Sequence, residues 1–389
     1  GLGGGMVMPL GMTILTRAAG PDRVGRVMAV LGVPMLIGPI GAPILGGWMI
    51  ESLSWHWIFL INVPVGVLAL ISAAVVLPKD VPAASESFDF VGMLMLSPGL
   101  ALLLFGVSSI PEEGTVTAPR VFVPALVGAA LIAGFVRHAF RPEHPLIDLR
   151  LFRNKQLTIA VTTMSLFGVA FFGAMLLIPT YFLQVRGEST LHTGLLLAPQ
   201  GLGAMVTMPI AGKFADRSGP GRVVLAGMVP IVLGMAVLTQ IGADTSYGLL
   251  LGTLFVLGMG MGAAMMPTMS AALQTLTNHE IARGSTMMNI VQQIASSVGT
   301  AIMSVVLTEQ VRTSPAAGAA IGARQDPSIA ATLPPEVFAQ GLDEAASGFA
   351  TSFTVAFALT VVTVVAAYFL PRRAAASTDN ESRPPVIVH

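Results

Sequence analysis

The chain is dominated by long apolar stretches that carry no charged side chain. A helix needs about 20 residues to cross the roughly 30 Å of hydrocarbon in a bilayer. Ten stretches reach or approach that length: residues 28–50, 57–77, 90–110, 121–137, 157–184, 193–212, 223–243, 247–272, 285–308 and 348–370. The opening sequence to Thr16 reads as the second half of an eleventh. The stretches are continuous and do not alternate with polar residues, so they predict an all-α membrane protein and not a membrane barrel.

Composition excludes several other classes of protein. Charged residues make up 10% of the chain, against about a quarter in soluble domains. The chain has no cysteine, which excludes a secreted disulfide scaffold. Its formal net charge is zero, so no electrostatic feature points to a nucleic-acid partner. The expected surroundings are a lipid bilayer.

The basic residues predict how the helices are oriented, because Lys and Arg are concentrated in cytoplasmic joints. With alternate joints assigned to the two sides, sixteen of the 20 basic residues fall on one side. The four on the other side are Arg120, Arg186, Arg312 and Arg324. One miscounted helix would remove this asymmetry. It therefore supports the helix count and predicts a multi-pass protein of the cell membrane with a cytoplasmic C-terminus.

A short repeat indicates two related halves, which are common in transporters. Residues 4–9 resemble residues 262–267, and each copy is followed by a polar joint with an Arg/Gly pair. Seven predicted helices lie between the two copies, whereas a duplicated six-helix unit would place five there. We therefore expect two inserted helices, at 90–110 and 121–137. The full protein is expected to have 14 helices, three of them before Gly1.

One predicted helix, 28–50, contains a run of small residues and prolines. The residues of interest are Gly38, Pro39, Gly41, Pro43, Gly46 and Gly47. Glycines let two helices approach closely, and proline removes a backbone hydrogen bond and kinks its helix. Such a packing groove is common in membrane proteins of many functions, so the run alone does not identify one.

Together with the residues after it, this run resembles a family signature. Residues 38–47 and 54–66 are similar to the antiporter motif and the following helix of the major facilitator superfamily. They are similar more narrowly to its 14-helix drug:proton antiporters, the EmrB/QacA type, as is the segment 145–153. The resemblance covers essentially the whole chain and implies the major facilitator fold and export. It also implies that the Gly and Pro residues of the run form a close-packed, proton-tight helix contact.

A charged motif lies in the joint between the stretches 193–212 and 223–243. Its residues of interest are Gly212, Asp216, Arg217, Gly219 and Arg222. The two glycines are expected to permit a tight turn, and Asp216 can accept hydrogen bonds from either arginine or from a helix N-terminus. Their spacing matches the loop motif of the resembled family, which implies a cytoplasmic latch. The alternative is that the arginines only set the topology.

Candidate substrate contacts are aromatic and amide side chains: Phe167, Phe171, Gln200, Asn289 and Gln293. Asn289 and Gln293 begin a polar stripe at helical spacing, and a polar face turned to lipid would be costly. This stripe is therefore expected to face a cavity or another helix, while Gln200 and Gln292 are single polar residues. Aromatic faces suit a promiscuous apolar cavity. Packing against lipid or neighbouring helices is the alternative for them.

No ionisable residue lies well inside a predicted helix, so the coupling of transport to protons has no evident carrier here. The resemblance implies carboxylates on the first helix and an arginine on the fourth, both before Gly1. No hydrolase elbow, zinc-binding helix or phosphate loop is present in the sequence. We therefore predict no enzyme activity, no catalytic residue, no metal and no cofactor, with the proton gradient as the energy source.

The predicted domains are the end of an N-terminal bundle (1–77), two inserted helices with a cytoplasmic linker (78–156), a C-terminal six-helix bundle (157–371) and a disordered tail (372–389). Within the bundle, 309–347 is predicted to be an external loop, with a solvated linker and a gating hairpin as the two alternatives. Pro334–Glu344 is a candidate for a short amphipathic helix on the outer surface. The predicted function is export of lipophilic small molecules in exchange for protons by alternating access. The alternatives are a solute uptake permease of the same fold and a transport-inactive fragment.

Overall fold

The computed structural model describes residues 38, 41–76, 88–113, 117–142, 145–273, 278–330 and 333–370. All regular structure in these residues is helical, which confirms the predicted fold class. Within them, nine helices are long and apolar enough to cross a membrane. They coincide with nine of the ten predicted stretches. The tenth, 28–50, is described only in part and is helical over 41–52. The opening stretch to Thr16 and the tail lie outside the described residues.

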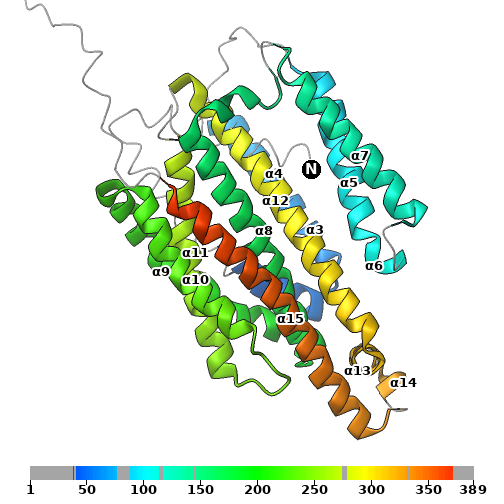
Figure 1. Ribbon diagram of the computed structural model, residues 1–389. Coiled ribbons are helices and arrows are strands. Elements are labelled where there is room, and N and C mark those ends of the chain that lie inside the picture. Colours follow the sequence, from blue (N-terminus) through cyan, green and yellow to red (C-terminus); the bar gives the residue numbers. More distant parts are fainter. Residues whose placement is uncertain are drawn as a thin grey trace, which may run out of the picture.

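The described helices after residue 52 run in this order along the chain, and Figure 1 labels all of them except the short 3-10 helix η1. They are α3 (Trp57–Leu60), α4 (Asn62–Val76), α5 (Phe90–Ser108), α6 (Ile110–Glu113), α7 (Pro119–His138), η1 (Leu149–Arg153), α8 (Lys155–Gln184), α9 (Thr190–Ser218), α10 (Pro220–Leu238), α11 (Tyr247–Leu273), α12 (Asn278–Thr313), α13 (Pro315–Gln325), α14 (Pro327–Ala330) and α15 (Pro335–Tyr368).

Helix α8 is central to the main bundle. It begins at the N-cap Asn154, whose side chain accepts hydrogen bonds from the backbone N–H groups of Gln156 and Leu157. It packs against α12, α15, α11 and α9. Its contact side buries large side chains, among them Phe171, Leu177 and Tyr181. The helix is therefore covered by other helices, whereas a lipid-facing helix would leave such residues exposed.

Small residues set the separation of the bundle helices. A Cβ built at Gly173 on α8 would lie 2.7 Å from the carbonyl oxygen of Gly299 on α12. A Cβ at Gly262 on α11 would lie 2.6 Å from the carbonyl oxygen of Ala204 on α9. Such contacts bring helix backbones together and replace the hydrophobic driving force that is missing between helices in lipid.

Helices α5 and α7 pack against each other, and α5 lies against α12 (Figure 1). A Cβ at Gly128 would lie 2.5 Å from the backbone nitrogen of Leu103, so this pair also depends on a glycine contact. Asp89 caps the first turn of α5 and joins it to the end of α7. Its carboxylate accepts hydrogen bonds from Gly92 N (2.8 Å) and Leu146 N (3.1 Å), and it lies 2.8 Å from His138 Nε2.

The helix predicted at Pro334–Glu344 is present, but it is not a short one. Helix α15 runs without interruption from Pro335 to Tyr368, so the predicted surface helix forms its first turns. The physical reason is its packing against α13, where a Cβ at Gly341 would lie 2.7 Å from the Cβ of Ala320. Small residues at this contact let α15 continue past the apolar stretch that the sequence predicts.

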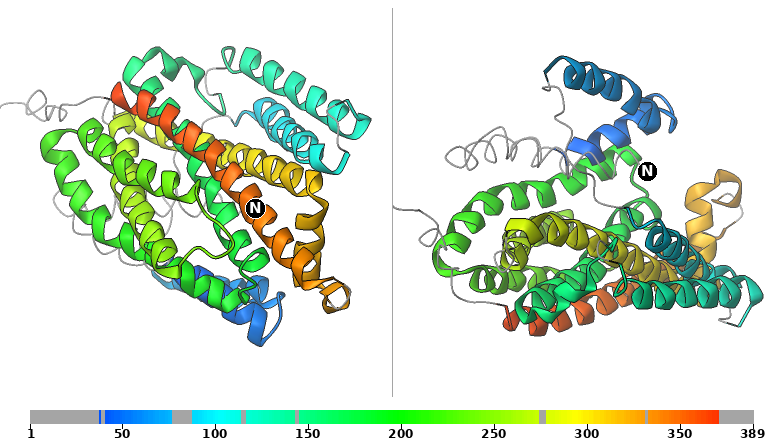
Figure 2. Two further views of the ribbon diagram at one scale, coloured as in Figure 1. Left: turned by 60° about the horizontal axis from the view of Figure 1, so that its bottom comes forward. Right: turned by 90° about the horizontal axis from the view of Figure 1, so that it is seen from above.

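Helices 41–52 and α4 lie to one side of the main bundle (Figure 2). None of the α4 residues is buried in the described part of the chain. Helix 41–52 reaches α9, and this meeting of segments far apart in sequence positions the candidate site.

Candidate functional site

Helix 41–52 contacts the N-terminus of α9 directly through backbone atoms. A Cβ built at Gly47 would lie 2.5 Å from the carbonyl oxygen of Thr190 and 2.8 Å from the Cα of Leu191. On the partner helix, a Cβ at Gly194 would overlap the carbonyl group of Pro43. Because glycine stands on both sides, the two backbones meet with no side chain between them.

Polar contacts reinforce the same meeting. The hydroxyl of Thr190 donates to the carbonyl oxygen of Gly47 (3.3 Å), and Leu191 N donates to the Glu51 carboxylate (3.2 Å). The Ser189 hydroxyl caps α9 by accepting from His192 N (3.2 Å). A carboxylate at a helix N-terminus is favourable because the first N–H groups of the helix lack partners within it.

The described residues of the Gly/Pro run differ in their surroundings. Pro43 and Gly47 make the contact with α9, and Gly41 is half-buried on the same helix. An added Cβ at Gly38 or Gly46 would meet no described atom within 4 Å. Pro39 lies outside the described residues. The proton-tight role of the run stays a prediction, and the observed close approach is at Gly47.

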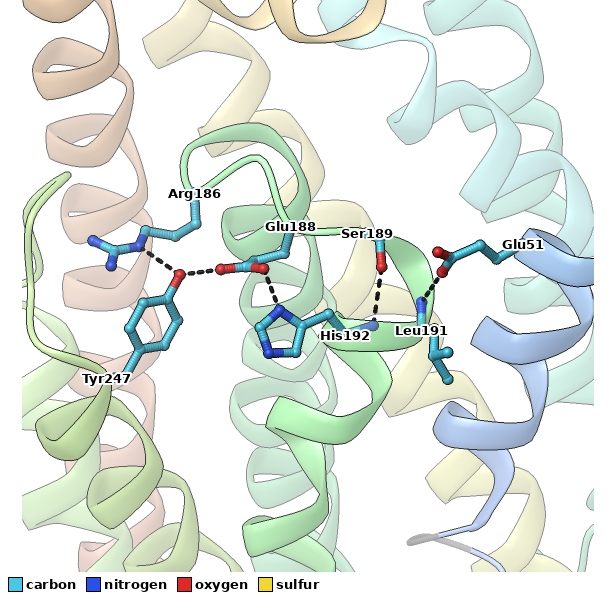
Figure 3. A network of polar contacts seen from close by, with 7 residues as sticks. All are labelled: Glu51, Arg186, Glu188, Ser189, Leu191, His192 and Tyr247. Carbon is cyan, nitrogen blue, oxygen red and sulfur yellow. Dashed lines mark hydrogen bonds and ion pairs between the residues drawn. The ribbon is translucent and has the colours of Figure 1, made fainter.

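A polar network surrounds the turn between α8 and α9, beside this contact (Figure 3). The carboxylate of Glu188 accepts the hydroxyl of Tyr247, and Nδ1 of His192 lies 2.5 Å from it. Arg186 lies over the Tyr247 ring, 4.5 Å from its centroid, and its Nε donates to the Tyr247 hydroxyl (3.5 Å). Its guanidinium also donates to the carbonyl oxygen of Ala243. The network thus ties the α8–α9 turn to the start of α11.

The same network sets the ionisation of Glu188. Burial raises the pKa of its carboxyl, but hydrogen bonds from Tyr247 and His192 and the charge of Arg186 outweigh burial, so the pKa is below its usual value. The ionised form is therefore favoured in this arrangement. The stabilisation that Glu188 provides is present above about pH 4.3, the ordinary value, and is lost as the pH falls through the lowered pKa.

A small cavity lies between α8, α11 and α12. Its volume is about 10 Å³, roughly the space of one water molecule. The lining residues are Met164, Phe167, Gly168, Phe172, Met265, Thr268 and Gln292. One amide and one hydroxyl among thioethers and aromatic rings are the kind of lining that orients an apolar ligand through a few polar contacts.

The predicted substrate contacts fall into three groups. Phe167 lines the cavity, and Phe171 is buried and stacks on it with ring centroids 5.2 Å apart. Gln200 is buried on α9 away from the cavity lining. Asn289 and Gln293 are exposed among the described residues. Gln292 lines the cavity in place of Gln293 because adjacent helical residues point about 100° apart.

One expectation about the charged motif, that Gly212 permits a tight turn, is wrong. Gly212 makes no turn, because α9 continues through it to Ser218, and the turn is made by Gly219 alone with a φ of +86°. Lys, Ala and Arg after Gly212 are good helix formers, which explains the continuation. Arg217 and Arg222 are exposed. The side chain of Asp216 lies outside the described set, so the latch stays a prediction.

Comparison with known proteins decides the family. Residues 1–300 match the family model of the Major Facilitator Superfamily. The chain belongs to the major facilitator superfamily. It is 49% identical over 392 residues to a Mycobacterium tuberculosis protein named "Multidrug resistance protein B homolog", covering 96% of this chain and 72% of the relative. Its predicted membership and its similarity to the drug-antiporter branch are confirmed.

Two further relatives of this superfamily are less similar. An uncharacterized MFS-type transporter of Bacillus subtilis, YhcA, is 30% identical over 309 residues, covering 79% of this chain and 58% of the relative. The putative multidrug resistance protein MdtD of Escherichia coli is 28% identical over 313 residues, covering 79% and 65%. As a member of the major facilitator superfamily, the chain is a multi-pass membrane transporter.

Sequence reasoning missed the network around Glu188. Two local signals were available: the four-residue spacing of Glu188 and His192, which places them on one helical face, and Arg186 on the side with few basic residues. Tyr247 carries no such signal, because 59 positions separate it from Glu188. The contact of Tyr247 with Glu188 becomes evident only when α8 and α11 are packed together.

Proposed function

We propose that this transporter exports lipophilic compounds, cations among them, in exchange for protons by alternating access. The observation that carries the proposal is the backbone contact between Gly47 and the first turn of α9. The names of two relatives refer to multidrug resistance, which supports drugs as the substrate class. The proton gradient would be the energy source, and no cofactor is required.

In this proposal the contact at Gly47 is a gate that is either packed, as in the structure, or separated. Glycine stands at both points of backbone contact, so a separation of the helices breaks this packing together with the side-chain hydrogen bonds of Thr190 and Glu51. Packed interfaces of this kind switch between states and do not deform gradually. From the distribution of basic residues we place this contact at the outer end, with the C-terminus and the Asp216 latch at the cytoplasmic end.

The cavity beside Phe167 and Gln292 is the proposed start of the substrate site. Its present volume of about 10 Å³ is far below the roughly 300–1,000 Å³ of a site for a drug-sized ligand. Substrate binding therefore requires α8, α11 and α12 to separate from one another or from facing helices. Thioethers and aromatic rings adapt to ligands of different shape, which agrees with a broad lipophilic specificity.

The test is proton flux in proteoliposomes that contain the full-length protein and a pH-sensitive dye in an acidic lumen. Adding a lipophilic cation outside should make the lumen more alkaline, because each cation that enters displaces protons. A protonophore and empty liposomes are the controls. Cation entry with proton entry would identify an uptake symporter, and no response to any lipophilic cation would refute drug–proton exchange.

A further inference from the structure

The turn between α8 and α9 is held from several sides. Tyr247 of α11 reaches it through Glu188, and Arg324 of α13 donates to the carbonyl oxygen of Val185 (3.3 Å). The backbone N–H of Glu188 donates to Phe182 O (3.0 Å), and Gly187 adopts a φ of +69° that favours glycine. The turn is thus a junction of four helices, and its conformation decides where the first turn of α9 lies.

Glu188 is the central charged group of this junction. Its side chain is 15% exposed, so it is largely shielded while remaining in contact with the solution. Two donors, Tyr247 on α11 and His192 on α9, converge on it. The titratable and charged groups that face the junction from the elements packed around it are Glu51, Tyr181, Arg186, His192, Tyr247 and Arg324. Asp244 directly follows Ala243, whose carbonyl oxygen accepts from Arg186.

Movement at Glu188 would be transmitted to the contact with helix 41–52. Ser189, the N-cap of α9, directly follows Glu188, and Thr190 and Leu191 make the hydrogen bonds to Gly47 and Glu51. A shift of the turn therefore displaces the atoms that hold helix 41–52. One covalent segment of four residues joins the network to the gate.

We propose that Glu188 is a proton-operated positioning residue that, when ionised, holds Tyr247 and His192 and keeps the first turn of α9 against helix 41–52. A proton transferred from hydronium in the outer solution to a carboxyl oxygen of Glu188 removes the charge that both donors face. The α8–α9 turn then separates from Tyr247, and the contact at Gly47 opens. The proposal rests on the proposed function in placing this turn on the outer side.

The direction of the effect follows from linkage. The closed arrangement lowers the pKa of Glu188, so proton binding must favour the arrangement in which these contacts are broken. The hydrogen bonds to an ionised acceptor are the stronger kind, so their loss is expected to change the closed-to-open ratio by about tenfold or more.

The experiment uses the full-length protein in liposomes with a single reporter cysteine. The 389 residues contain no cysteine, and any cysteine outside them is replaced by serine. Thr193 of α9 is 4% exposed and its hydroxyl has no hydrogen-bond partner in the described residues, so Thr193→Cys should fold normally. A membrane-impermeant thiol reagent is added outside. The rate at which it labels Thr193→Cys is divided by the rate at which it labels Thr313→Cys, an exposed position on α12, to correct for the change of thiol ionisation with pH. No substrate and no export are needed.

The normalised rate at Thr193→Cys should be low at neutral pH and rise in acid. In Glu188→Gln it should be raised about tenfold at neutral pH and no longer depend on pH. Glu309→Gln is the matched control, because Glu309 is a carboxylate paired with Arg312 at the same end but outside the junction. It should behave as the unsubstituted protein does. Tyr247→Phe removes one donor to Glu188, so its acid response should begin at higher pH.

Two results would overturn the proposal. One is a Glu188→Gln protein that is labelled like the parent at every pH while Thr313→Cys shows that it is folded and inserted. The other is an acid response that persists unchanged in Glu188→Gln, because the proton would then act elsewhere. If labelling follows the proposal but no lipophilic cation exchanges for protons, the junction stands and the proposed function fails.

Discussion

Replacing Gly47 by alanine tests the helix contact most directly. The added Cβ would lie 2.5 Å from the Thr190 carbonyl oxygen and 2.8 Å from the Leu191 Cα, both backbone atoms that cannot rotate away. Ordinary contact begins near 3.4 Å, so the helices must separate by about 0.9 Å. Overpacking costs about 1–3 kcal/mol, and weakening of the two hydrogen bonds adds about 1 kcal/mol. The total, about 2–4 kcal/mol, changes the closed-to-open ratio by roughly 30- to 900-fold.

Gly46→Ala is the matched control on the same helix. A Cβ at Gly46 meets no described atom within 4 Å, and alanine is a better helix former than glycine by about 1 kcal/mol. The sequence pattern expects both positions to be sensitive, whereas the structure expects only Gly47 to be. We expect Gly47→Ala to lower cation-driven proton flux at least about tenfold and to expose Thr193→Cys, with Gly46→Ala near the parent in both.

The assay compares both variants in proteoliposomes at equal protein content. Protein inserted in the membrane is checked by labelling at Thr313→Cys, so a folding defect is distinguished from a gating defect. If Gly47→Ala transports as well as Gly46→Ala and leaves Thr193→Cys protected, the backbone contact does not gate transport and the reasoning from its geometry fails.

Three further predictions follow from other parts of the chain. Asp89→Asn should destabilise the α5–α7 pair by about 1–3 kcal/mol and lower the thermal midpoint. Burial raises the pKa of Asp89, but hydrogen bonds from Gly92, His138 and Leu146 outweigh it and lower the pKa, so this stabilisation is present above about pH 3.9 and is lost in stronger acid. Melting curves at several pH values check both points, and an unchanged midpoint would contradict them. Gln292→Leu should change the order of preference among lipophilic cations, whereas Gln293→Leu should not. Competition between cations for transport measures this order. Equal effects of the two substitutions would show that the cavity is not part of the substrate site. Asp216→Asn should lower the transport rate more than substrate affinity, and a fall in affinity alone would exclude the latch.

The helices and their membrane setting could be predicted from local sequence. Nine described spans coincide with predicted apolar stretches, because hydrophobic length is a property of consecutive residues that no tertiary contact has to supply. The ends of the helices were less predictable. Helix α9 continues past Gly212 to Ser218, and α15 begins at Pro335, because helix-forming residues and the contact with α13 extend helices beyond their apolar segments.

The candidate site, too, could be predicted from the sequence only in part. The sequence by itself determined that residues 38–47 favour close helix packing and that Phe167 and Phe171 share one helix, since spacing and residue size are local properties. Only the tertiary structure decided that Gly47 and not Gly46 meets α9, that Gln292 and not Gln293 faces the cavity, and that Tyr247 reaches Glu188. Those facts depend on how helices are rotated and placed against partners far away in sequence, which helical periodicity does not specify.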